Sequence, residues 1–264
     1  MQNTEQPKIL ALDFDGVICN GLKEYFQTTI RTYQQIWLDK NQDNLEVWAN
    51  SFYQLRPVIE TGWEMPILLR ALVLKYDQKN LESNWHQICS EIVEKENLNK
   101  QQVMSELDEV RDHWIKTDLD NWLALHEFYP GVLEKLGQLL ESSTLLYIVT
   151  TKEGRFVKQL LKQQNLSFPE EHIFGKEVKQ PKYETLRQIL KKNQEATSNL
   201  WFIEDLFKTL KSVQNQSDLS EVKLFLADWG YNTSKTHQIV KEDNTISLLC
   251  LEKFSQDFPQ WIKT

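Results

Sequence analysis

The chain has 264 residues, enough for one large domain or two of moderate size, and its 41% hydrophobic and 26% charged residues are typical of a soluble protein. It contains 38 acidic and 30 basic residues, and the formal net charge of -8 argues against general binding of nucleic acid, which requires a basic surface. The polar N-terminal residues lack the apolar region of a signal peptide, and no apolar run approaches the length of a membrane span.

The first predicted element is a strand at residues 8–13, and its apolar residues lead directly to Asp13 and Asp15. Apolar residues that end in a pair of acids are typical of a buried strand in an open α/β sheet, where the carboxyl end faces a ligand site. Two carboxylates this close repel each other unless a cation or a shared proton relieves them. The pair therefore predicts a metal site, an acid–base couple, or both.

The residues from about 24 to 120 predict helices and no convincing strand. We expect these helices at residues 23–38, 45–55, 66–76, 84–96 and 101–115.

The second half of the chain alternates between helices and strands. The helices are expected at residues 130–140, 155–164 and 183–193, and the strands at 144–149, 173–174, 200–203, 222–227 and 246–251. This alternation predicts a mostly parallel sheet with right-handed crossovers. We therefore expect an α/β core formed by residues 1–20 and 128–264, with a helical domain, residues 21–127, inserted after the first strand.

Polar residues also follow two later strands of the predicted sheet. Thr150 and Thr151 follow the strand at 144–149, Glu204 and Asp205 follow the strand at 200–203, and Lys182 lies between them at the start of a helix. Because the carboxyl ends of parallel strands share one edge, we expect these residues to gather near the first acidic pair.

This set of side chains is suited to phosphoryl transfer. Carboxylates are ligands that Mg²⁺ prefers, and a hydroxyl, an ammonium and backbone N–H groups can hold the oxygens of a phosphoryl group. One carboxylate can attack phosphorus to form an aspartyl phosphate, while a second protonates the leaving oxygen and then deprotonates the attacking water. Positioning and charge neutralisation of this kind are what phosphoryl transfer requires.

Four segments resemble the motifs of the haloacid dehalogenase (HAD) superfamily, in order and in rough spacing. They are Asp13-Phe14-Asp15-Gly16-Val17, Tyr147-Ile148-Val149-Thr150-Thr151-Lys152, Lys182, and Ile203-Glu204-Asp205. The helical insertion resembles the C1 cap of the phosphoglycolate phosphatase and β-phosphoglucomutase branch, and Asp228-Trp229-Gly230-Tyr231 resembles a segment of the phosphoglycolate phosphatases. The resemblance implies a HAD Rossmann-like parallel core with a helical C1 cap inserted after the first strand.

The resemblance also implies catalytic and metal-binding roles. Asp13 would be the nucleophile and a Mg²⁺ ligand, and Asp15 the general acid and base, with its backbone carbonyl on the metal. Asp205 would be another metal ligand, and Glu204 a direct or water-mediated one. Family members that cleave carbon–halogen or carbon–phosphorus bonds lack an acid at the position of Asp15, so its presence favours phosphate esters.

The phosphate-binding residues implied by the resemblance are Thr150, with its neighbour Thr151, and Lys182. In the helical insertion, Arg56 lies in a charged and aromatic segment and is a candidate for pairing with an acidic substrate group. An ordinary connection between helices is an equal alternative for the segment around Arg56.

Structural alternatives also exist for the main motifs. Thr150 suits the end of a strand as a β-branched residue, Lys182 suits the exposed start of a helix, and Glu204-Asp205 suits the N-terminal cap of the next helix. Lys176 and Lys179 precede Lys182 and compete with it for the third motif.

The segment after Asp205 departs from the family pattern. Leu206, Phe207, Lys208 and Thr209 stand where the branch usually has a small serine and a downstream glycine or aspartate, which puts the metal affinity in question.

We expect a Mg²⁺-dependent phosphatase that acts on a small phosphorylated metabolite and has no nucleic-acid or membrane partner. The three widely separated cysteines indicate reduced thiols in a cytoplasmic protein, which would be a monomer or a homodimer. A phosphomutase of the same family fits the same motifs. A non-catalytic HAD-like interaction protein is the alternative from another class, suggested by the altered residues after Asp205.

Overall fold

The computed structural model describes residues 6–37 and 44–262, and the chain divides into two compact units. One unit is formed by Met1–Asn20 and Glu127–Thr264, and the other by Gly21–His126. The second junction lies one residue before the position expected from the sequence.

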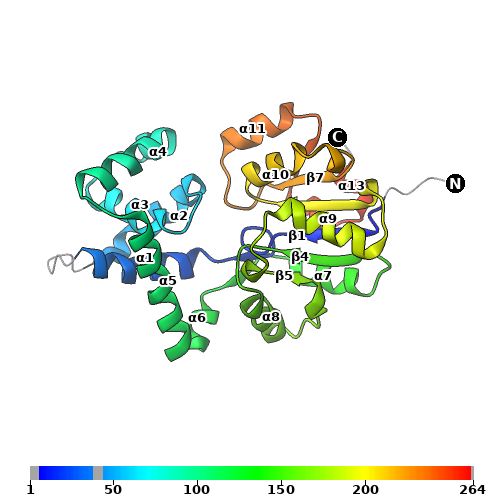
Figure 1. Cartoon of the computed structure of the whole chain (residues 1–264), viewed down its shortest axis with the longest axis horizontal. Coiled ribbons are helices and arrows are strands. Elements are labelled where there is room, and N and C mark those ends of the chain that lie inside the picture. The colour runs from blue at the N-terminus through cyan, green and yellow to red at the C-terminus, as the bar shows by residue number, and fades with distance from the viewer. Residues whose placement is uncertain (1–5, 38–43, 263–264) are drawn as a thin grey trace. The chain divides into compact units, whose positions relative to one another are not determined.

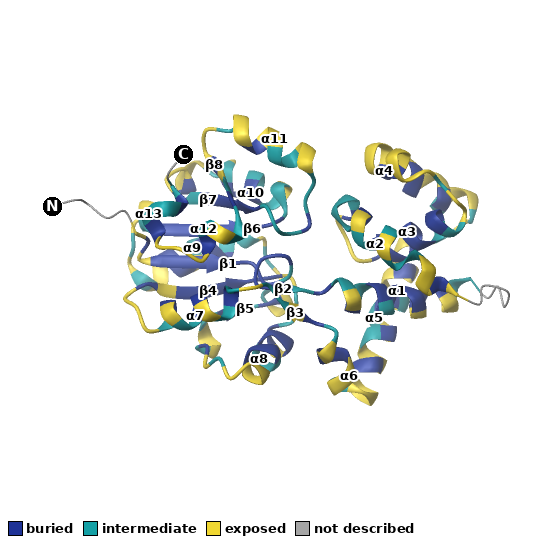
Figure 2. Ribbon diagram, turned by 180° about the vertical axis from the view of Figure 1, so that it is seen from behind, coloured by how far each residue is buried: buried dark blue, intermediate teal, exposed yellow. Residues whose placement is uncertain are grey.

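The first unit contains a six-stranded parallel sheet in the order β5-β4-β1-β6-β7-β8 (Figure 1). These strands are β1 (Ile9–Leu12), β4 (Leu145–Val149), β5 (Ile173–Phe174), β6 (Leu200–Glu204), β7 (Lys223–Ala227) and β8 (Ile246–Leu249). All four residues of β1 and all five of β6 are buried, as the dark strands at the centre of the unit show (Figure 2). The parallel sheet confirms the predicted α/β class.

Helices pack on both faces of the sheet because successive residues of each strand face opposite sides. Ile9 and Ala11 form one core with Leu186 and Leu210. On the other face, the Trp201 ring of β6 lies 5.9 Å from that of Trp261. The helices of this unit are α7 (Val132–Leu140), α8 (Gly154–Gln163), α9 (Lys182–Asn193), α10 (Phe207–Gln214), α11 (Ser234–Glu242), α12 (Leu251–Phe254) and α13 (Phe258–Trp261).

The register of the sheet determines which residues meet at its carboxyl edge. Leu12, the last residue of β1, pairs with Ile148 of β4 on one side and with Ile203 of β6 on the other. The residues that follow these three strands therefore leave the sheet next to one another, as the sequence predicts.

The second unit is helical. It contains α1 (Leu22–Ile36), η1 (Leu45–Trp48), α2 (Ala49–Leu55), η2 (Arg56–Val58), α3 (Glu64–Val73), α4 (Gln78–Lys95), α5 (Lys100–Thr117) and α6 (Leu119–Ala124). Its core is separate from that of the sheet and includes the tryptophans Trp63 and Trp85.

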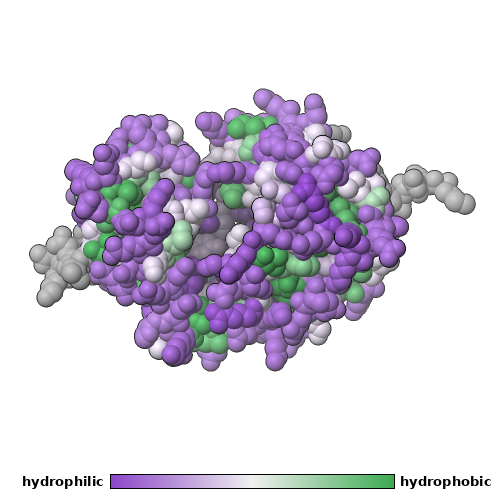
Figure 3. Space-filling model, in the orientation of Figure 1, coloured by the Kyte–Doolittle hydropathy of each residue, from purple (hydrophilic) through white to green (hydrophobic). Residues whose placement is uncertain are grey.

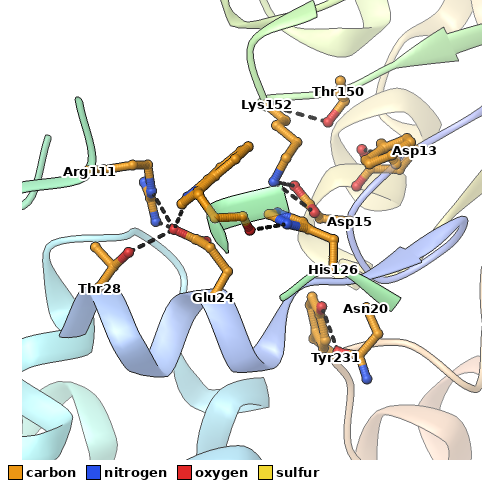
Figure 4. A network of polar contacts seen from close by, with 12 residues as sticks. Asp13, Asp15, Asn20, Glu24, Thr28, Arg111, His126, Thr150, Lys152 and Tyr231 are labelled. Carbon is orange, nitrogen blue, oxygen red and sulfur yellow. Dashed lines mark hydrogen bonds and ion pairs between the residues drawn. The ribbon is translucent and has the colours of Figure 1, made fainter. Parts of the chain in front are cut away.

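A buried carboxylate links three helices of this unit. Glu24 of α1 accepts hydrogen bonds from Nε of Arg111 at 2.8 Å, from Nε1 of Trp122 at 3.0 Å and from the hydroxyl of Thr28 at 2.7 Å. Figure 4 shows these groups converging on Glu24. Since a buried charge needs such partners, the network holds α5 and α6 against α1.

Two short strands, β2 (Cys19–Asn20) and β3 (Glu127–Phe128), pair antiparallel where the chain leaves and re-enters the first unit. These two strands were not among the predicted elements, whereas β5, which is equally short, was.

Some predicted element bounds were wrong. α4 begins at Gln78, where the side chain of Asp77 accepts a hydrogen bond from the Asn80 amide and caps the helix. The predicted start at residue 84 coincides with a kink inside α4, where Asn84 has a non-helical φ of -130° and ψ of 26°. α3 ends at Val73 rather than residue 76, where Lys75 takes a positive φ of 62°. The last strand stops at Leu249, and Leu251 begins α12. The helices α6, α10, α11, α12 and α13 were not predicted.

The face shown in Figure 3 is mostly hydrophilic, with hydrophobic residues in small separate areas. Across residues 6–37 and 44–262, no helix combines the length and the apolar character needed to cross a membrane.

Candidate active site

The candidate site is built around an ammonium group held between two buried carboxylates. Nζ of Lys182, at the start of α9, lies 2.8 Å from Oδ1 of Asp13 and 2.7 Å from Oε2 of Glu204. Asp13 follows β1 and Glu204 ends β6, and the pairing of these strands brings the two acids together. The structure thus places the ammonium of Lys182 among the acids at the carboxyl edge of the sheet.

Asp205 joins this group from the residue after β6. Ligand atoms of Asp13, Glu204 and Asp205 lie within 4.8 Å of one another, and all three residues are buried. The backbone amide of Tyr231 donates to Oδ2 of Asp205 at 2.7 Å, and the Asn232 side chain donates to its carbonyl at 3.1 Å. The first contact directs the Asp205 carboxylate, and the second holds its backbone.

Two glycines allow the chain to approach Asp205 closely. Gly16 has a φ of +88°, and a Cβ there would lie 2.1 Å from Oδ2 of Asp205. A Cβ on Gly230 would lie 2.3 Å from Cβ of Asp205. Any larger residue at these positions would displace the carboxylate, so both glycines are required for its placement.

The backbone that follows Glu204 holds the carboxylate of this residue. The amides of Asp205 and Leu206 donate to Oε1 of Glu204 at 3.1 and 3.0 Å, and α10 begins at Phe207. Asp205 accepts hydrogen bonds from Tyr231 and Asn232, which come from a distant part of the chain. Tyr231, in the segment that resembles the phosphoglycolate phosphatases, thus supplies one of the contacts that hold Asp205.

The charges in this cluster do not balance. Burial and the nearby Glu204 raise the pKa of Asp13 to about 8, although Lys182 acts in the opposite direction. Burial also raises the pKa of Glu204. Burial alone would lower the pKa of Lys182, but the two carboxylates raise it above its usual value. Lys182 contacts Asp13 and Glu204 while Asp205 lies beside them, and a further cation would relieve the repulsion among the three acids.

The ligand set fits a hard divalent cation. The three acids offer only oxygen atoms, which Mg²⁺ prefers, and Mg²⁺ usually binds through one or two carboxylates while keeping several waters. Oε2 of Glu204 already accepts from Lys182 and its Oε1 accepts from two amides, so Asp13 and Asp205 are better placed as direct ligands.

Asp15 lies in the same loop as Asp13 but has a different partner. Nζ of Lys152 lies 3.2 and 3.3 Å from its two carboxylate oxygens, and both side chains are largely buried. Figure 4 shows the Lys152 side chain pointing toward Asp15. Lys152 was given no role from the sequence, although its position two residues after Thr150 places it at the same edge.

Thr150 lies at the end of β4 and is buried. Its amide donates to the carbonyl of Phe174 at 2.9 Å, and its hydroxyl accepts from the amide of Lys152 at 3.1 Å. Thr151 is exposed. The structure thus brings Thr150 to the shared edge of the sheet, and phosphate binding by either threonine stays a prediction.

Arg56 belongs to the helical unit. Its Nη1 donates to the carbonyl of Ile59 at 3.0 Å, and its guanidinium lies 5.1 Å from the centre of the Tyr25 ring. These contacts hold the turn after α2, and substrate binding by Arg56 stays a prediction.

A model of the haloacid dehalogenase-like hydrolase family matches residues 67–217, more than half of the chain. The match includes Thr150, Lys182, Glu204 and Asp205 and begins after the first acidic pair. No curated protein sequence matches the chain.

Solved structures of similar fold align over almost the whole chain. One is described as a predicted phosphatase from Clostridium acetobutylicum, with 14% identity, a TM-score of 0.60, and coverage of 95% of this chain and 97% of the other. Another is a haloacid dehalogenase-like hydrolase from Streptococcus pneumoniae, with 15% identity, a TM-score of 0.57, and coverage of 92% and 94%. A third is described as a predicted phosphoglycolate phosphatase from Haemophilus somnus, with 13% identity, a TM-score of 0.56, and coverage of 89% and 90%.

Proposed function

Because the chain belongs to the haloacid dehalogenase-like hydrolases, a family of enzymes, we propose that it is a Mg²⁺-dependent phosphatase of small phosphorylated metabolites. The observation that carries this proposal is the buried cluster in which Lys182 contacts both Asp13 and Glu204 while Asp205 lies beside them. A nucleophilic carboxylate, a cation site and an ammonium for the phosphoryl oxygens are the parts that phosphomonoester hydrolysis needs.

In this mechanism Asp13 attacks phosphorus. Its carboxylate oxygen forms a bond to phosphorus as the bond to the ester oxygen breaks, and Asp15 gives its proton to the leaving alcohol. Asp15 then takes a proton from water, whose oxygen attacks the aspartyl phosphate and releases inorganic phosphate and free Asp13. Lys152 directs the Asp15 carboxylate through its contacts with both oxygens.

The remaining residues hold the phosphoryl group. Lys182 offsets the charge of the phosphoryl oxygens and of Asp13, and the hydroxyl of Thr150 donates to one of these oxygens. Asp13, the Asp15 carbonyl and Asp205 would hold Mg²⁺, with Glu204 bound directly or through water. When bound, Mg²⁺ supplies positive charge against the carboxylates and the transferring phosphoryl group.

The direct test is an assay of p-nitrophenyl phosphate and a panel of metabolite phosphates, with and without Mg²⁺. We expect Mg²⁺-dependent release of inorganic phosphate from at least one ester. Absence of hydrolysis across the panel would contradict the proposal and favour a non-catalytic interaction protein. Transfer of the phosphoryl group to a second sugar phosphate instead of water would indicate a phosphomutase.

Metal binding should depend on pH because of Asp13. Its pKa of about 8 without metal means that Asp13 carries a proton below that pH, and a metal ligand must lose it. We expect the affinity for Mg²⁺ to fall about tenfold for each pH unit below this pKa. Calorimetric titration at about pH 7, in buffers of different ionisation enthalpy, should detect release of about one proton per metal bound. An affinity that is constant across this pH range would contradict the assignment of Asp13 as a ligand.

A further inference from the structure

A pocket of about 390 Å³ opens in the α/β unit beside the candidate site. It lies at the carboxyl ends of β4 and β5 and at the start of α9, and its size is that of a small-molecule site. Thr150 and Lys182, which we propose to hold the transferred phosphoryl group, are among its lining residues. The pocket thus begins where the phosphoryl group would be bound.

The charged residues that line this pocket are lysines. Lys176, Lys179 and Lys182 line it, and no acidic residue is among the described residues that do so, although the chain has a net charge of -8. The acid in the same segment, Glu177, accepts a hydrogen bond from the amide of Gly154 at 3.1 Å and does not line the pocket.

A short 3₁₀ turn places two of these lysines together. The turn η4 spans Lys176–Val178, and the amide of Lys179 donates to the carbonyl of Lys176 at 3.2 Å. The turn and the left-handed Lys179 that follows it bring these two exposed lysines to the lining of one pocket. Lys179 takes the left-handed conformation, with φ 52° and ψ 37°, which is uncommon for a residue with a long side chain.

The segment that carries these lysines, residues 175–180, is hydrogen-bonded to the loop after β4 and to α9. The amide of Lys176 donates to the carbonyl of Lys152 at 2.9 Å, and a Cβ on Gly175 would lie 2.3 Å from the amide nitrogen of Gly154. The Gln180 side chain donates to Thr185 and accepts from Gln188, both at 3.0 Å. These contacts fix the backbone of the segment from which the two exposed lysine side chains extend.

We propose that this pocket binds a second phosphoryl group on the leaving part of the substrate, so that the preferred substrates are bisphosphate esters. The proposal rests on the proposed function for the site of hydrolysis. Two ammonium groups on one side of a pocket attract a phosphate dianion more strongly than a neutral hydroxyl, and Lys179 and Lys176 supply them. Phe174 and Val178, both partly buried, form apolar parts of the same pocket.

The test compares fructose bisphosphate with fructose monophosphate in the full-length, Mg²⁺-loaded enzyme. We expect a higher kcat/KM for the bisphosphate, mainly through a lower KM. The ratio of kcat/KM for the bisphosphate to kcat/KM for the monophosphate should fall about tenfold in Lys179→Gln. Lys191→Gln, an equal change of charge at an exposed lysine later in α9, should leave the ratio unchanged. An equal ratio in the two variants would overturn the proposal.

A binding experiment separates failure of the pocket from failure of the proposed activity. Both fructose esters are titrated by calorimetry into Asp13→Asn and into Asp13→Asn combined with Lys179→Gln. If Asp13→Asn binds the bisphosphate more tightly than the monophosphate and the double variant does not, the result supports a second phosphoryl site in the pocket, even if neither ester is hydrolysed. Equal affinities for the two esters in Asp13→Asn would overturn the pocket even if the enzyme hydrolyses other phosphates.

Discussion

Replacing Asp13 with asparagine is expected to lower kcat by at least about a thousandfold while the fold is retained. An amide cannot attack phosphorus, and it is a poorer ligand for a divalent cation than a carboxylate. Burial and Glu204 raise the pKa of Asp13 to about 8, so without metal at neutral pH the asparagine replaces a carboxyl that carries a proton and has the same shape. The metal-free variant should therefore unfold at the same temperature as the wild type or a higher one, measured by circular dichroism.

Asp228→Asn is the matched control for this variant. Asp228 follows β7 at the same edge of the sheet, but it lies outside the group formed by Asp13, Glu204 and Asp205. We expect its kcat to stay within about threefold of the wild type, since asparagine keeps the shape of this partly buried side chain and the three acids are unchanged. If the two variants lost activity equally, Asp13 would have no special role.

Replacing Lys182 with methionine should have the largest effect on stability. The ammonium lies 2.8 Å from Asp13 and 2.7 Å from Glu204, so its loss leaves two buried carboxylates without a positive neighbour. Removing one partner of a buried ion pair destabilises a protein by about 3–5 kcal/mol. We expect a loss of this size in the free energy of unfolding of the metal-free protein, measured by denaturation in urea, together with loss of phosphatase activity.

The pH dependence of this loss follows from the direction of the pKa shifts. Burial raises the pKa values of Asp13 and Glu204 in the folded protein, so the folded state retains protons that the unfolded state has released. Lys182 lowers both pKa values, so its loss raises them further. The stability of Lys182→Met should therefore fall with rising pH over a wider range than that of the wild type, from the ordinary carboxyl pKa to beyond about 8. Lys191→Met, at an exposed position of the same helix, should be about as stable as the wild type and should keep the wild type's pH dependence. A Lys182→Met protein as stable as this control would refute the proposed role of the ammonium.

Much of the α/β unit could be predicted from the sequence because its signals are local. The apolar strands of the sheet are distinct from their polar ends, and alternation with helices implies parallel pairing. Asp13, Thr150 and Glu204 follow β1, β4 and β6, which are neighbours in the sheet. Their meeting at one edge thus follows from chain order and from the preference for right-handed crossovers.

Other parts depend on contacts between residues far apart in the chain. The pair of Lys152 with Asp15 and the bond from the Tyr231 amide to Asp205 join segments that no periodicity relates. The lysines of the pocket become neighbours only through the turn at Lys176–Val178, which is too short for a helical pattern. α4 was predicted to start late because its first turn is polar and its start depends on one capping side chain, Asp77.

The most direct test of the account is to trap the phosphorylated enzyme. Hydroxylamine converts an aspartyl phosphate into a hydroxamate, which peptide mass spectrometry assigns to a single residue. After mixing the Mg²⁺-loaded enzyme with a phosphate ester that it hydrolyses, we expect the hydroxamate on Asp13, and none when the ester is omitted. Steady release of phosphate with no hydroxamate, or with one on another residue, would contradict Asp13 as the nucleophile.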